Sequence, residues 1–125
     1  MIEYLENGNL LPKIILGTLF NRRRPGWIVL LGHDTREAYD TIAQVLFDMR
    51  LLYRRTTKPH MSQLKDMTTI LHDPDSGPNS GMLLRGISAD LIIIDDPEVV
   101  ESRDHVAIAH LERPDGTLIK IGKKI

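Results

Sequence analysis

Cysteine is absent from this 125-residue chain, which excludes disulfide bonds, thiolate metal sites and a cysteine nucleophile. A strong excess of positive or negative charge is also lacking. The formal net charge is −1, so the molecule as a whole has no strong attraction to nucleic acid or to a membrane surface. Any such attraction has to come from local clusters. No apolar run approaches the roughly 20 residues that span a bilayer, and no segment has the pattern of a signal peptide. We therefore expect a soluble, cytoplasmic protein without membrane partners.

Several catalytic motifs are missing as well. The sequence contains no GxxxxGK[ST] phosphate loop and no GxSxG nucleophile elbow. Its five histidines show no HExxH spacing, and each is more often a surface or hydrogen-bonded residue than a metal ligand. They are His33, His60, His72, His105 and His110.

The composition indicates a globular protein. Hydrophobic residues make up 42% and charged residues 26% of the chain, a balance typical of folded proteins. The length suits one domain with its own hydrophobic core, so we expect residues 1–125 to form a single domain.

The central pattern is the apolar run Leu91–Ile94, which is followed by Asp95, Asp96 and Pro97. An unbroken apolar run of this kind predicts a strand that is buried on both faces, as in a parallel sheet. Proline cannot donate a ladder hydrogen bond, so the strand should end with both carboxylates at its carboxyl end. Ligands bind at that end in open α/β sheets. Alternatively, the two acids form a solvated turn, or Asp96 caps a following helix.

A second apolar run, Trp27–Leu31, predicts another buried strand. The helix that follows is predicted over Thr35–Arg50, and Asp34 with Glu37 resembles an acidic capping box at its start. Strand, turn and helix make half of a βαβ unit. The apolar stripe of this helix is expected to comprise Ala38, Ile42, Val45, Leu46 and Met49.

The remaining segments carry weaker patterns. We predict strands at Met1–Leu5, Leu51–Tyr53, Thr68–His72 and Met82–Arg85, and short helices at Leu10–Phe20 and Pro59–Met67.

Near the C-terminus, Val106–Leu111 and Thr117–Ile121 flank the turn sequence Arg113–Gly116 and predict a hairpin. A helix through Glu98–Leu111 is the competing interpretation. Taken together, the segments predict a three-layer α/β fold with a largely parallel sheet and a peripheral β-hairpin.

Two arginine clusters are candidate phosphate contacts. Arg22, Arg23 and Arg24 form a basic turn, and Arg54 and Arg55 form a second cluster. Guanidinium groups side by side can bind nucleic-acid phosphates. The alternative is a solvated loop that keeps the surface soluble.

Three acids are candidate magnesium ligands. If the two apolar strands are parallel neighbours, Asp34, Asp95 and Asp96 lie near one edge of the sheet. Clustered carboxylates with water are typical Mg²⁺ ligands in phosphoryl-transfer sites.

The stretch Arg85–Pro97 resembles the Walker B region of phage large terminase and helicase-like ATPase cores, in which an Arg-Gly pair precedes a strand that ends in two acids. Trp27–Ala38 is similar to the strand, turn and helix that follow the phosphate loop in those motors, and the resemblance spans roughly Trp27 to Glu98. It implies that Asp95 holds magnesium and that Asp96 stands at the place of the catalytic acid, which is usually glutamate.

The sequence departs from these motors in two ways. The second acid is an aspartate, which is one methylene shorter than glutamate. The Walker A loop is missing, and we expect the residues before Trp27 to be too few for an ordinary strand, loop and helix. Without that loop and its lysine, the nucleotide phosphates lose their main binding groups, so nucleotide is a doubtful cofactor.

Three functional hypotheses follow. The chain is a small viral-type protein that resembles part of a terminase-like or helicase-like core and acts with nucleic acid or with a protein of a nucleic-acid-processing complex, without being an autonomous ATPase. It is a non-catalytic inhibitor or adaptor that binds protein. Or it is a magnesium-dependent phosphotransfer or nuclease domain that uses Asp34, Asp95 and Asp96.

Overall fold

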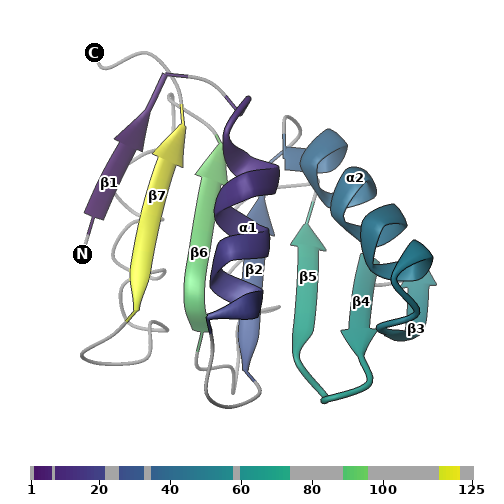
Figure 1. The fold of residues 1–125 in the computed structure, drawn as a ribbon. Coiled ribbons are helices and arrows are strands. Elements are labelled where there is room, and N and C mark those ends of the chain that lie inside the picture. Colours follow the sequence, from purple (N-terminus) through teal and green to yellow (C-terminus); the bar gives the residue numbers. More distant parts are fainter. Residues whose placement is uncertain are drawn as a thin grey trace.

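A computed structural model describes residues 2–6, 8–21, 26–32, 35–57, 60–73, 89–95 and 116–121. These residues form two helices and a seven-stranded sheet (Figure 1). The helices are α1 (Leu11–Phe20) and α2 (Thr35–Asp48). The strands are β1 (Ile2–Leu5), β2 (Trp27–Leu31), β3 (Leu52–Thr57), β4 (His60–Leu64), β5 (Thr69–Asp73), β6 (Ala89–Asp95) and β7 (Thr117–Ile121).

The sheet is mostly parallel, with the order β1-β7-β6-β2-β5-β4-β3. β1, β7, β6, β2 and β5 run parallel, whereas β4 and β3 add an antiparallel edge. The predicted α/β fold with a largely parallel sheet is therefore confirmed, and the two apolar strands β2 and β6 are neighbours near its centre (Figure 1).

Both helices cover the same face of the sheet, where they contact each other (Figure 1). On this face β2 contributes Ile28 and Leu30, and β6 contributes Leu91 and Ile93, to one hydrophobic core with the helices. The described residues therefore supply two of the three predicted layers. The third predicted layer is not tested by the described residues.

The opposite face of the sheet is buried too. Val29 of β2 and Ile92 of β6 are 0% exposed and belong to a second cluster of apolar side chains. Successive residues of a strand point to opposite faces, so burial on both faces requires apolar residues at every position. This requirement explains why β2 and β6 appear in the sequence as unbroken apolar runs.

Helix α2 buries most of its predicted stripe. Ala38, Ile42 and Leu46 are buried, whereas Met49 lies beyond the helix and is 49% exposed. The helix ends in a Schellman motif: Leu51 N donates to Leu46 O and Arg50 N donates to Phe47 O, each at 3.0 Å. Arg50 has a φ of 59°, the left-handed conformation that glycine usually provides at this position.

Two predicted secondary-structure elements are wrong. Pro59–Met67 is not a helix: residues 60–64 form β4, because their backbone groups pair with β3 on one side and β5 on the other. Thr117–Ile121 is not a hairpin arm: as β7 it has parallel partners on both edges, β6 and β1. The antiparallel edge of the sheet is instead built from β3 and β4.

Other predictions concern residues that the structure does not describe, namely the strand Met82–Arg85 and the alternatives for Glu98–Leu111. The strands predicted at Met1–Leu5 and Thr68–His72 and the helix at Leu10–Phe20 are confirmed within a residue or so. The strand at Leu51–Tyr53 extends further, to Thr57. Among the described residues, no helix has the length and hydrophobicity needed to cross a bilayer.

The left-handed residue after α2 leads to a stability prediction. Replacing Arg50 by glycine removes the steric strain that a Cβ creates at this φ, so we expect the free energy of unfolding to rise by roughly 0.5–1 kcal/mol. Arg50→Ala is the matched control, because alanine removes the charge but keeps the Cβ. Urea denaturation of the three proteins measures the effect, and a glycine variant no more stable than the alanine variant contradicts it.

Candidate functional site

The residues before β2 form a strand, a short loop and a helix. β1 covers residues 2–5 and α1 begins at Leu11. The expectation that too few residues precede Trp27 for this arrangement is therefore wrong. A strand, loop and helix in this order is also the local arrangement that surrounds a phosphate loop.

The start of α1 nevertheless offers fewer amide donors than a phosphate loop does. Leu11 N donates to Gly8 O at 3.1 Å, so this amide is already used within the loop. Pro12 lies in the first turn and has no amide hydrogen to donate. Leu10 occupies the N-cap position without a side-chain hydrogen bond to the helix. Lys13 follows in the first turn, but it is preceded by Pro12 and followed by Ile14, where a phosphate loop has a glycine before its lysine and a hydroxyl residue after it.

The carboxyl ends of β2 and β6 meet at one edge of the sheet. The two strands are parallel, and Leu31 pairs with Ile94, so Asp95 is the next residue beyond the last pair. Asp95 is the final residue of β6, whereas Asp34 and Asp96 lie outside the described residues. Within the part of the chain that the structure describes, no three His, Asp or Glu side chains gather in a way that could hold a metal ion.

At the same edge, two side chains bind the carbonyl of Gly32 at the end of β2. Thr35 Oγ1 donates to Gly32 O at 2.7 Å, and His72 Nε2 lies 3.3 Å from the same oxygen. A carbonyl can only accept, so the Nε2 atom of His72 carries the proton in this hydrogen bond. Gly32 has a φ of 113°, which other residues rarely adopt. These contacts tie β5 and the first turn of α2 to the end of β2.

Tyr39 of α2 connects this edge to the antiparallel strands. Its ring stacks on the His72 ring, with centroids 5.2 Å apart and an interplanar angle of 19°. Its hydroxyl forms a 2.9 Å hydrogen bond with Ser62 Oγ of β4, and both groups are buried. The guanidinium carbon of Arg55, on β3, lies 5.3 Å from the ring centroid. A single buried tyrosine thus contacts three strands of the sheet.

The predicted phosphate-binding arginines differ in their surroundings. Arg55 Nη2 donates to Asp40 Oδ1 at 2.8 Å, so its charge is already paired with a carboxylate on α2. Arg54 is exposed on β3. Arg22, Arg23 and Arg24 lie outside the described residues. Arg54 and Arg55 are therefore adjacent on β3, but Arg55 is paired with a carboxylate of α2, whereas Arg54 is exposed.

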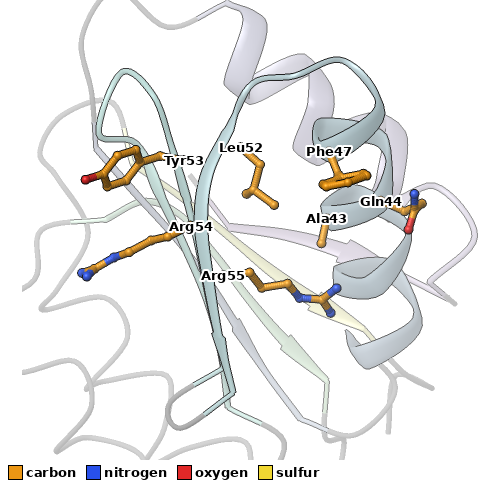
Figure 2. Close-up of a pocket in the computed structure, with 7 residues that line it drawn as sticks. All are labelled: Ala43, Gln44, Phe47, Leu52, Tyr53, Arg54 and Arg55. Atoms are coloured by element: carbon orange, nitrogen blue, oxygen red, sulfur yellow. The ribbon is translucent and has the colours of Figure 1, made fainter.

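A groove of about 410 Å³ lies between α2 and β3, the strand at one end of the sheet. Figure 2 shows Leu52 and Arg55 on the side of β3 that faces α2, while Tyr53 and Arg54 extend from its other side. The groove is lined by Ala43, Gln44, Phe47, Leu52, Tyr53, Arg54 and Arg55.

Sequence reasoning missed the aromatic residues of this region. Tyr39 sits next to Ala38 at the margin of the apolar stripe, and its buried partners Ser62 and His72 are distant in sequence. Phe47 and Tyr53 are each 65% exposed. Their proximity to Arg54 and Arg55 in the sequence is the signal that could have identified the groove.

Comparison with known proteins supports the fold. No protein-family model matches the chain, and no curated protein matches its sequence. Among solved structures, the chain is similar to the large terminase from the thermophilic bacteriophage D6E, with a TM-score of 0.65 and 10% sequence identity. The match covers 97% of this chain and 32% of the terminase chain.

The fold is terminase-like. At 10% identity the likeness concerns the fold alone, and the chain spans about a third of the length of that terminase. The likeness extends beyond the Trp27–Glu98 region to which the sequence resemblance pointed, because it covers nearly the whole chain.

The buried contact between Tyr39 and Ser62 leads to a second stability prediction. Tyr39→Phe and Ser62→Ala each leave one buried hydroxyl without its partner, so each should lower the free energy of unfolding by roughly 1–3 kcal/mol. The double variant should lose less than the sum of the two, with a coupling energy of about 1 kcal/mol.

Chemical denaturation of the four proteins of this cycle measures the coupling. Gln44→Ala is the control, because it removes an exposed hydrogen bond to Asp48 and should change the stability by less than about 0.5 kcal/mol. Strictly additive losses for Tyr39→Phe and Ser62→Ala would show that the two hydroxyls do not stabilise each other.

Proposed function

We propose that this chain is a terminase-like module that acts with nucleic acid, or with a motor that handles nucleic acid, and does not hydrolyse nucleotide itself. The observation that carries the proposal is the β1–loop–α1 unit. It stands within a terminase-like fold, but the lysine in its first turn, Lys13, lies between Pro12 and Ile14 and not between the glycine and the hydroxyl residue of a phosphate loop.

The chemistry of that loop argues against ATP hydrolysis. A phosphate loop binds the β- and γ-phosphates through several free amide groups and a lysine. Here the amide of Leu11 is bonded to Gly8 O, and Pro12 has none. Transfer of a phosphoryl group depends almost entirely on positioning and charge stabilisation, so the missing amide donors and the missing hydroxyl residue after Lys13 remove much of what an ATPase needs.

The action on nucleic acid is supported by fold and charge together. The D6E protein is a large terminase, and Arg54 and Arg55 place two cations on an accessible edge of this chain. With a net charge of −1, attraction to phosphates has to be local, as at such a cluster.

We expect calorimetric titration with Mg-ATP to show no saturable binding up to about 1 mM nucleotide. We also expect labelled DNA or RNA to bind in the micromolar range at low salt and to weaken as salt rises. A functional phosphate-loop ATPase serves as the positive control for nucleotide.

Two outcomes would overturn this proposal. Magnesium-dependent ATP binding at micromolar concentrations would restore the ATPase interpretation. Capture of a protein partner by a chain that binds no nucleic acid would favour the inhibitor or adaptor hypothesis.

A second candidate function is magnesium-dependent phosphotransfer or nuclease chemistry. It is favoured by the β2–β6 register, which brings the carboxyl ends of two parallel strands to one edge and puts Asp95 at the end of β6. Carboxylates suit Mg²⁺, and the bound ion would supply Lewis-acid stabilisation of phosphate oxygens. Asp34, Asp95 and Asp96 are the proposed residues, with Asp96 as the catalytic acid.

For this candidate, Asp95→Asn should weaken Mn²⁺ binding, used as a spectroscopic substitute for Mg²⁺, by roughly tenfold or more. Electron paramagnetic resonance of free Mn²⁺ gives the affinity. Asp48→Asn, on the exposed surface of α2, is the matched control. Equal Mn²⁺ affinity in the wild type and both variants would remove Asp95 from any metal site.

A further inference from the structure

We infer that the groove between α2 and β3, together with the opposite side of β3, binds single-stranded nucleic acid, with one base stacked on Phe47, another stacked on Tyr53 across the strand, and phosphates held by Arg54 and Arg55. The inference rests on the proposed function and names the ligand class and the surface. Its basis is the composition and shape of this groove (Figure 2).

The groove carries exposed apolar side chains. Of the six large hydrophobic residues that are clearly exposed in the described part of the chain, Phe47 and Tyr53 line the groove, and Met49 is close to them in sequence. Two of these are aromatic, and each ring is 65% exposed. Exposed rings leave apolar surface in contact with water. A stacked base would cover that surface, and every base has a face that can stack.

The charged groups complement a phosphate backbone. Arg54 and Arg55 are neighbours on β3 and extend from opposite sides of the strand: Arg54 lies beside Tyr53, and Arg55 extends toward α2, the helix that carries Phe47 (Figure 2). Cationic groups that alternate with stacking rings characterise surfaces that bind single strands without sequence preference. A duplex hides its base faces, so the exposed rings favour an unpaired strand.

A peptide strand fits this edge less well. The pairing of β3 with β4 shifts register between Leu52 and Arg54, which disturbs the regular backbone spacing that an added strand would have to match. Charged side chains on an edge strand also oppose strand addition, and a second copy of β3 would bring arginines close together. A phosphate backbone, in contrast, is attracted by the same arginines.

The carboxylate of Asp40 competes with a phosphate for Arg55. Asp40 bonds its guanidinium at 2.8 Å, and both side chains are partly exposed. An exposed ion pair of this kind is weak, so a phosphate can replace the carboxylate at little cost. Arg54 is therefore the first contact for phosphate, and Arg55 becomes available when Asp40 is displaced.

The test uses a fluorescein-labelled oligothymidylate of about 20 nucleotides and a duplex of matched length, with anisotropy as the measurement. Phe47→Leu and Tyr53→Leu remove the rings but keep apolar side chains. We expect each to weaken oligothymidylate binding by roughly five- to a hundredfold. Phe20→Leu is the control, because Phe20 is an exposed ring on α1 that does not line the groove.

The same assay tests whether Arg54 and Arg55 bind the phosphates. Arg54→Gln should weaken binding and reduce the slope of log affinity against log salt by about 0.7, while Lys13→Gln on α1 should change neither. Asp40→Asn should strengthen binding about twofold or more, since it releases Arg55 from its carboxylate partner. Thermal melting checks that each variant is folded.

The outcomes separate this inference from the proposed function. If the wild type binds oligothymidylate and the groove variants bind it equally well, the inference is wrong and the proposed function stands. If the duplex binds as tightly as the single strand, the stacking role is wrong. If the wild type binds neither nucleic acid, the nucleic-acid part of the proposed function fails. Loss of a captured protein partner in the groove variants, with oligothymidylate binding intact, would make the groove a protein-docking surface.

Discussion

Pairing of β2 with β6 is the constraint on which the rest of the structure depends. Both strands are buried on both faces, so their side chains contribute to two separate hydrophobic clusters. Hydrogen bonding between them is parallel, which requires each connection to cross back over the sheet. The two described helices lie on one face, and the carboxyl ends of the parallel strands lie at one edge. A candidate site at that edge is a consequence of the pairing.

A second set of contacts fixes the turn between β2 and α2. Gly32 O accepts from Thr35 and from His72, and His72 stacks on Tyr39, which reaches Ser62 and Arg55. Through this chain of contacts, the carboxyl edge of the parallel strands is physically continuous with the groove beside β3. Buried hydroxyl and imidazole groups need partners, so these residues also fix the position of α2 on the sheet.

The start of α1 shows why fold and activity are separate questions. The chain keeps a strand, loop and helix in a terminase-like arrangement, yet the amide of Leu11 is already bonded, Pro12 has none, and Ile14 replaces the hydroxyl residue of a phosphate loop. Fold similarity therefore supports the architecture, while the chemistry has to be argued from particular residues. The groove beside β3, with its arginines and exposed rings, is the region in which such residues do gather.

The sequence by itself determined the buried strands and the helices. An unbroken apolar run indicates a strand buried on both faces, and an apolar stripe with a period of 3.6 residues indicates a helix buried on one side. It also indicated the arginine pair on β3. Only the tertiary structure decided that residues 60–64 form a strand between two others, that β7 lies between β1 and β6, and that Tyr39 meets His72 and Ser62. These features depend on pairing between segments far apart in the chain, and no local pattern encodes such partners.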